Sequence, residues 1–148
     1  MTPDELINNI NKAVEKTATE MLPTMQEAAL TGKALLARRV QSEGFGKQYR
    51  SRAYVALRAL RGFEIKFVNL TFTGAMFRGW KVPGNYREGL KIGGSVAGTD
   101  LETKNKLSWN KSRFPKFDQT NEEERTILKE SLIEPRLFET LKKNLFGS

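Results

Sequence analysis

The sequence contains neither cysteine nor histidine. Without cysteine, the chain has no disulfide framework, no thiolate metal site and no thiol nucleophile. Without histidine, it lacks the commonest general base and the commonest metal ligand. It also has no run close to the roughly 20 apolar residues that a membrane-spanning helix requires. Its start, MTPDELINNINKAVEK, is acidic and amphipathic rather than signal-like. We therefore expect no membrane partner.

The sequence motifs of common catalytic and phosphate-binding sites are absent as well. A metal site would have to be built from carboxylates, and there is no DxDxDG-like calcium loop. Gly93 and Gly94 form a glycine pair, but the GxxxxGK[ST] frame of a phosphate-binding loop does not surround them. Acids in the middle of the chain, such as Glu64 and Glu88, are scattered, and the sequence alone leaves open whether two of them converge in a cleft. We predict that the protein is not an enzyme and has no catalytic, cofactor-binding or metal-ligating residue.

The charge of the chain is high and unevenly distributed. The 148 residues carry a formal net charge of +8, with 39% hydrophobic residues, as in a globular domain. Residues 33–61 contain eight basic residues against one acid, whereas residues 121–134 contain five acids against two basic residues. Such a surplus of positive charge serves solubility or meets a negatively charged partner. The basic middle and the acidic late segment could also pair between neighbouring copies.

Both ends of the chain are predicted to be helical. A capping box at residues 2–5 starts the first of two helices over residues 1–42, and apolar residues repeat at helical spacing behind it. Pro23 is expected to kink or end that first helix. Residues 120–146 are predicted to form C-terminal helices, because acids fill their first turn and an apolar stripe follows, with an interruption at Pro135.

The basic middle contains a third predicted helix, over residues 49–60. Tyr49 and Leu57 share its expected apolar face, and Arg50 and Arg58 share the opposite face with Tyr54. These arginines could grip phosphates of a nucleic acid, or could be solvated or paired with acids on neighbouring copies. The residues that we expect to face a neighbouring subunit or DNA are Arg50, Arg52, Arg58 and Arg61.

Strand-like segments follow this helix. Residues 63–70 alternate between apolar and polar side chains, as a half-buried strand does. A short helix is predicted to place Met76, Phe77 and Trp80 in the core, and strands are expected on both sides of a turn at residues 83–85. The order of elements predicts one α+β domain over residues 1–148, with an antiparallel sheet of about four strands packed by N- and C-terminal helices.

Residues 97–118 are polar, basic and poorly periodic. We interpret them as a long basic loop or arm, with one short strand around residues 107–109, because such loops in small domains are usually functional or disordered. Aromatic residues alternate with basic ones near its end. The residues that we expect to form a partner-binding arm are Lys104, Lys106, Trp109, Arg113, Phe114 and Phe117.

Three segments resemble a known family. Residues 69–82, NLTFTGAMFRGWKV, resemble a segment of small bacteriophage tail-completion and head–tail joining proteins, which include the virion-morphogenesis and minor-tail groups. There a strand leads into a Thr-Gly turn, a short helix and another strand. The stretches YRSRAYVALRALRG and KNKLSWNKSRFPKFDQTNEEERTILKESL resemble a helix and the ending of the same proteins. The matching residues of the first segment are Leu70, Thr71, Thr73, Gly74, Met76 and Val82.

The resemblance covers about residues 45–145 and leaves residues 1–40 unmatched. It implies a structural virion protein of the phage neck or tail end, assembled in the host cytoplasm, that forms a hexameric or dodecameric ring. Its partners would be copies of itself, the portal-side connector and tail proteins, with non-specific contact to packaged DNA. Thr73 and Gly74 would make a structural turn in which the glycine lets the chain bend sharply. The alternative is a small basic nucleic-acid-binding protein that uses the same arginine face.

Overall fold

The computed structural model describes residues 1–44, 46–70 and 75–147. The chain divides into two compact units, each built from separate stretches of the sequence. Unit 1 comprises Met1–Gly32, Val82–Val96 and Glu122–Ser148. Unit 2 comprises Lys33–Lys81 and Ala97–Asn121. Two compact units can belong to one domain or form two, so the single domain over residues 1–148 stays a prediction.

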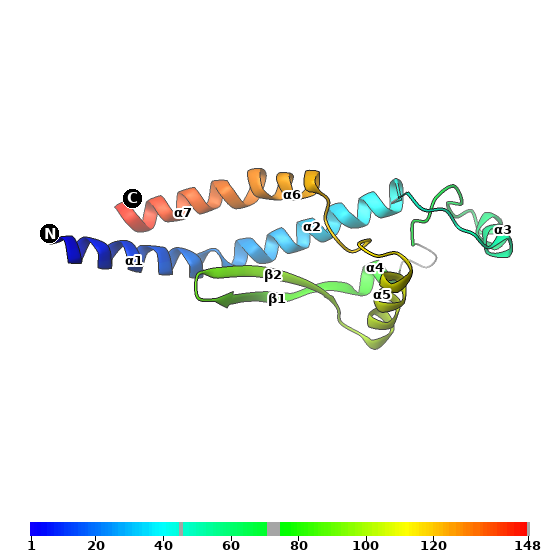
Figure 1. The fold of residues 1–148 in the computed structure, drawn as a ribbon, viewed down its shortest axis with the longest axis horizontal. Helices are drawn as coiled ribbons and strands as arrows, with labels where there is room; N and C mark the ends of the chain where they lie inside the picture. Colours follow the sequence, from blue (N-terminus) through cyan, green and yellow to red (C-terminus); the bar gives the residue numbers. More distant parts are fainter. Residues whose placement is uncertain (45, 71–74, 148) are drawn as a thin grey trace. The chain divides into compact units, whose positions relative to one another are not determined.

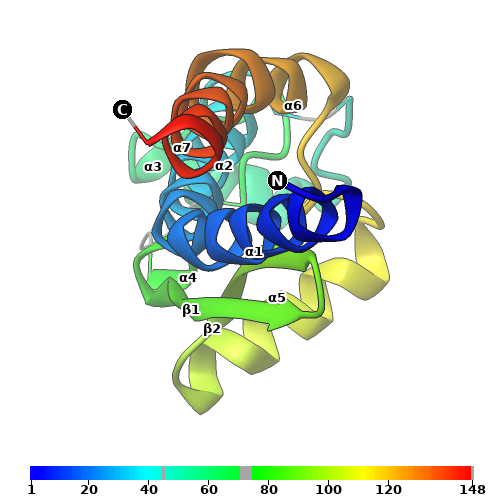
Figure 2. The same ribbon diagram turned by 90° about the vertical axis from the view of Figure 1, so that its left-hand side faces the viewer.

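Unit 1 is a stack of three layers. Its middle layer is α1 (Pro3–Glu20) with the first part of α2 (Leu22–Ser42). Figures 1 and 2 show the C-terminal helices on one side of this layer and a β-hairpin on the other. The C-terminal run is continuous and consists of α6 (Glu122–Leu128), the π-helical turn η1 (Lys129–Ile133) and α7 (Glu134–Phe146).

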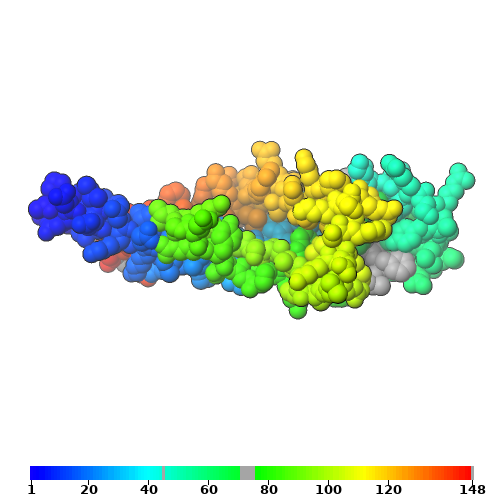
Figure 3. Space-filling model, turned by 60° about the horizontal axis from the view of Figure 1, so that its bottom comes forward, coloured from blue at the N-terminus to red at the C-terminus, as the bar shows by residue number. Residues whose placement is uncertain are grey.

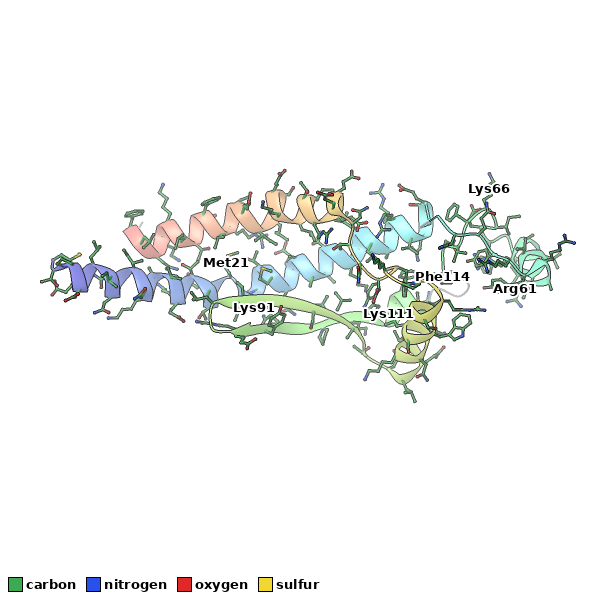
Figure 4. The ribbon with its side chains drawn as sticks, viewed as in Figure 1. Met21, Arg61, Lys66, Lys91, Lys111 and Phe114 are labelled. Atoms are coloured by element: carbon green, nitrogen blue, oxygen red, sulfur yellow. The ribbon has the colours of Figure 1, made fainter. Side chains whose placement is uncertain are left out.

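The helices of unit 1 follow the local signals of the sequence. The side chain of Thr2 accepts a hydrogen bond from the backbone of Glu5, whose carboxylate accepts one from the backbone of Thr2, so the predicted capping box is confirmed. The chain breaks between α1 and α2 at Met21, two residues before Pro23, and Figure 4 labels Met21 at this junction. The C-terminal helices are also confirmed, with the π-helical turn directly ahead of Pro135.

The third layer of unit 1 is the hairpin of β1 (Trp80–Glu88) and β2 (Lys91–Gly98). Within the described ranges the sheet has these two strands, so the fold is α+β but the prediction of about four strands is wrong. Residues 83–85 lie inside β1 rather than in a turn. The chain reverses instead at Gly89, whose φ of 59° suits a residue without a Cβ.

The hairpin is held to the middle layer by a close backbone approach at Gly94. A Cβ at this position would lie 2.4 Å from the carbonyl oxygen of Met25 and 2.8 Å from Cβ of Ala29, both on α2. Hydrogen bonds near the hairpin end support the same contact, because Arg87 donates to Glu15 and Thr19 on α1.

We expect Gly94→Ala to lower the free energy of unfolding of unit 1 by about 1–3 kcal/mol, because the added methyl meets backbone atoms that cannot swing aside. The matched control is Gly84→Ala on the neighbouring strand, where an added Cβ meets no atom within 4 Å. Urea denaturation followed by circular dichroism at 222 nm compares the two variants. Equal stability of both would contradict the close approach.

Unit 2 is mainly helical. It contains α3 (Arg52–Leu60), α4 (Ala75–Gly79) and α5 (Leu101–Arg113), together with the second part of α2. Met76, Phe77 and Trp80 are buried, so the prediction that they pack in the core is confirmed. The other buried apolar side chains that the structure describes in this unit are Leu36, Val40, Val68 and Phe117.

Two predicted elements of unit 2 are wrong. Residues 63–70 are not a strand, because their backbone groups are used elsewhere: Phe63 donates to the carbonyl of Arg58 (2.9 Å), and Val68 donates to that of Lys47 (2.8 Å). Residues 101–113 are the helix α5 rather than a loop or an arm. Figure 3 shows the outer surfaces of α5 (yellow-green to yellow) and of the hairpin (green).

Candidate functional site

A wide groove in unit 2 has a volume of about 1230 Å³. One side is formed by residues 46–51 and the start of α3, and the other by residues 106–114 of α5 and the segment after it. Val68, Leu70 and Met76 contribute apolar surface between the two sides. The basic residues on the groove are Lys47, Arg50, Lys106 and Arg113, and the lining residues that the structure describes include no Asp or Glu.

A buried arginine organises the first side of the groove. Arg58 on α3 has no exposed surface. Its Nε donates to the carbonyl of Glu64 (2.9 Å) and its Nη2 donates to Oδ1 of Asn69 (2.9 Å). The guanidinium carbon lies 4.5 Å from the ring centre of Tyr49 and 5.7 Å from that of Tyr54. Arg58 therefore ties α3 to the irregular segment that follows it, through charge-assisted hydrogen bonds and cation–π contacts.

Tyr49 stands between this buried cluster and the groove. Its hydroxyl donates to Oδ1 of Asn69 (3.3 Å) and accepts from the backbone N–H of Asn69 (3.3 Å). Its ring meets that of Tyr54 edge to face, with 5.4 Å between centres. Burial raises the pKa of the Tyr49 phenol above its usual value, although the charge of Arg58 opposes this shift. This shift favours the protonated phenol, which is the form that donates to Asn69.

The second side of the groove depends on how α5 begins. Asp100 caps the helix and accepts from the backbone N–H and the hydroxyl of Thr103, both at 2.8 Å, and these bonds lower the pKa of Asp100. Gly79 at the end of α4 lets Thr103 come close, since a Cβ there would lie 2.0 Å from the threonine Oγ1. Buried Asn110 donates to the sulfur of Met76 at 3.5 Å, which joins the middle of α5 to α4.

The exposed surface of α5 on the groove is aromatic and cationic. Trp109 is 57% exposed, and the guanidinium carbon of Arg113 lies 4.5 Å from its ring centre. Phe114 follows directly and is half-buried, and Figure 4 labels it in the segment that leaves α5. A flat indole with a cation beside it favours partners that combine negative charge with an apolar or aromatic group.

The structure brings five of the predicted site residues together on the groove. Arg50 borders the groove on one side. Arg52 is an exposed residue at the start of α3, Arg61 is exposed at its end, and Lys104 is exposed on α5. The predicted residues on the opposite side of the groove are Lys106, Trp109, Arg113 and Phe114.

Four further predicted residues are not among those that the structure describes on the groove. Arg58 was expected on an exposed face, but it is fully buried because α3 turns that face toward Glu64 and Asn69. Phe117 was expected in a mobile arm, but it is 2% exposed and belongs to the core of unit 2. Thr73 and Gly74, the predicted turn, lie outside the described residues.

Sequence reasoning also missed two residues of the groove. Lys47 was counted only as part of the basic stretch, and Tyr49 was assigned to an apolar helix face, whereas both line the groove ahead of α3. The spacing of Tyr54 and Arg58 could have revealed this arrangement. The two residues are four apart, so their side chains meet on one helix face and the arginine can lie against the tyrosine ring.

Comparisons with known proteins give no match: no protein-family model, no curated protein and no solved structure is similar to this chain. None of the helices in the described ranges is long and apolar enough to cross a bilayer. Acidic side chains do not gather there in a group of three or more that could hold a metal ion. Function is therefore argued from the surfaces of the two units.

Proposed function

We propose that the chain is a structural virion subunit of a bacteriophage neck or tail end, where identical copies close into a ring between the portal-side connector and the tail. Its role is assembly rather than catalysis. The resemblance of residues 69–82 and of the two flanking segments to tail-completion and head–tail joining proteins supports this assignment. One observation on unit 1 supports it independently of any resemblance.

Apart from Met21, the apolar residues that unit 1 buries in its described part are alanines, whereas several large apolar side chains are exposed. Its described buried apolar residues are Ala13, Ala18, Met21 and Ala28. Large apolar side chains of α1 and α7 are exposed instead, at 37% or more of their surface: Leu6, Ile7, Ile10, Leu137, Phe138, Leu145 and Phe146. This reverses the usual order, in which leucine, isoleucine and phenylalanine are among the most buried residues.

The exposed apolar residues gather on helices that pack together. α1 lies against α7, and Figure 1 places the start of α1 and the end of α7 at the same end of unit 1. A hydrogen bond from Asn144 to Thr17 (3.0 Å) joins the two helices. Apolar surface concentrated in this way marks a protein–protein interface more often than an isolated exposed leucine does. We infer that a neighbouring subunit covers it in the assembled protein.

The experiment is a mass measurement of the purified protein by native mass spectrometry, alone and with the portal-side connector and tail proteins of the same phage. We expect a closed oligomer of six or twelve copies, formed alone or on addition of a partner. Replacing Ile7 and Phe138 by Ser should shift the oligomer toward monomer, because it removes apolar area from the interface. A wild-type monomer that binds none of these proteins would overturn the proposal.

The second candidate function is non-specific binding of nucleic acid, which the groove of unit 2 favours. Four basic residues and an exposed tryptophan, with no described acid among them, suit a phosphate backbone and a stacked base. In that case the wild-type monomer would bind single-stranded DNA with an affinity that falls steeply with salt concentration, and no protein partner would be needed.

A further inference from the structure

The groove of unit 2 is complementary to a partner that carries both negative charge and an apolar group. Its rim carries Lys47, Arg50 and Arg113, while Leu70, Trp109 and Phe114 provide accessible apolar surface. Val68 and Met76 are buried beneath this surface, so the apolar part of the groove rests on packed side chains. A helix can satisfy both requirements at once if its acids flank an apolar side chain at a spacing of three or four residues.

The chain carries such a helix in unit 1. Along α6 and η1, Glu123, Ile127 and Glu130 follow one another at spacings of four and three residues, and all three are exposed. Ile127 has 42% of its surface exposed. We call these three residues the acidic stripe. Neither glutamate takes part in an ion pair that the structure describes, whereas Glu134, further along, pairs with Lys129 (3.4 Å).

We propose that the groove of one copy binds the acidic stripe of a second copy, an inference that rests on the ring proposed above. Ile127 enters the apolar part of the groove, and the two glutamates meet the basic rim. Groove and stripe are different surfaces of the same chain, so the contact is heterologous and repeats from copy to copy. Where the rotation between copies closes, the result is a ring rather than a symmetric dimer.

The apolar part of the groove favours a protein helix over single-stranded DNA. A nucleic acid would use the basic rim and would stack on Trp109, but it has no branched aliphatic side chain that could pack between Leu70 and Phe114. The stripe supplies such a side chain in Ile127. The opposite charges of rim and stripe also predict that the interface weakens as salt concentration rises.

The test reverses the charge of each surface in the full-length chain. The groove variant is Lys47→Glu with Arg50→Glu, and the stripe variant is Glu123→Lys with Glu130→Lys. We expect each variant alone to associate about tenfold more weakly or worse than wild type, because like charges now face each other across the interface. An equimolar mixture of the two variants should assemble again, because every contact between them pairs opposite charges. Native mass spectrometry resolves the mixed assemblies from monomers.

The control changes the same number of charges away from both surfaces. Lys81→Glu with Lys91→Glu changes one exposed residue on each strand of the hairpin, where Figure 4 labels Lys91, and should leave assembly at the wild-type level. A wild-type ring that persists in both reversal variants would overturn the inference and leave the proposed function standing. Loss of single-stranded DNA binding in the groove variant, with its ring intact, would overturn it in favour of a nucleic-acid groove. A wild-type chain that never assembles would remove the proposed function and this inference together.

Discussion

Replacing Arg58 by Ala is expected to lower the free energy of unfolding of unit 2 by about 3 kcal/mol or more. The guanidinium makes charge-assisted hydrogen bonds to Glu64 and Asn69, and bonds of this kind contribute about 1.5–3 kcal/mol each. The substitution removes one of the two donors to Oδ1 of Asn69, leaves the carbonyl of Glu64 without the guanidinium, and opens a cavity between the rings of Tyr49 and Phe63. These losses act on the same small region, so the groove should lose its first side as well as its stability.

Tryptophan fluorescence during urea denaturation measures this effect, because the two tryptophans, Trp80 and Trp109, both belong to unit 2. The matched control is Arg52→Ala on the same helix, where the side chain is exposed and the change should stay within about 0.5 kcal/mol. Arg58→Lys should fall between the two, since lysine keeps the charge but lacks the planar fork that reaches both oxygens. Equal stability of the alanine variants would mean that Arg58 is not a structural residue.

The parts of the fold that the sequence predicted are those with local causes. The capping box at residues 2–5 depends on two side chains three residues apart, and it formed as expected. The burial of Met76, Phe77 and Trp80 follows from three large apolar side chains at helical spacing. Both predictions depend on residues close together in the sequence and not on contacts with the rest of the chain.

The errors on the helices of unit 2 have a different cause, which is that polar side chains face inward there. On α3 the buried residue is Arg58, while Leu60 is 86% exposed. An assignment by hydrophobicity therefore places the wrong face of this helix in the core. On α5 the buried residues are Thr103 and Asn110, and a helix with such an inner face has no apolar periodicity to reveal it. These polar groups are buried because specific partners satisfy them, and sequence patterns do not show those partners.

The candidate site was predicted in part for the same reason. Arg50, Trp109 and Arg113 were selected because basic and aromatic residues occur together, and all three line the groove. Their arrangement on two facing sides depends on Asp100 and Gly79, which fix where α5 begins. The groove is therefore a tertiary feature, and the composition of residues 97–118 could predict only that basic and aromatic side chains occur together there.

Replacing Phe117 by Ala tests whether this segment is a packed element or an arm. Phe117 is 2% exposed, and truncating a buried phenylalanine costs about 3–5 kcal/mol in lost burial and cavity formation. We expect unit 2 to unfold at a clearly lower urea concentration, as reported by the fluorescence of buried Trp80. In a mobile arm that orders only on assembly, the same substitution would leave the isolated chain unchanged.

The comparison variant is Trp109→Ala. Trp109 is only eight residues from Phe117 in the sequence, but we expect its replacement to have a different effect. Trp109 is 57% exposed and its described ring contact is with Arg113, so its loss should cost less than about 1 kcal/mol of stability. It should weaken assembly about tenfold or more, because an exposed tryptophan on a groove is a typical hot spot for a partner. Phe117 thus acts on folding and Trp109 on association. Stability loss in the Trp109 variant with normal assembly would reverse the two roles and place the binding surface elsewhere on the chain.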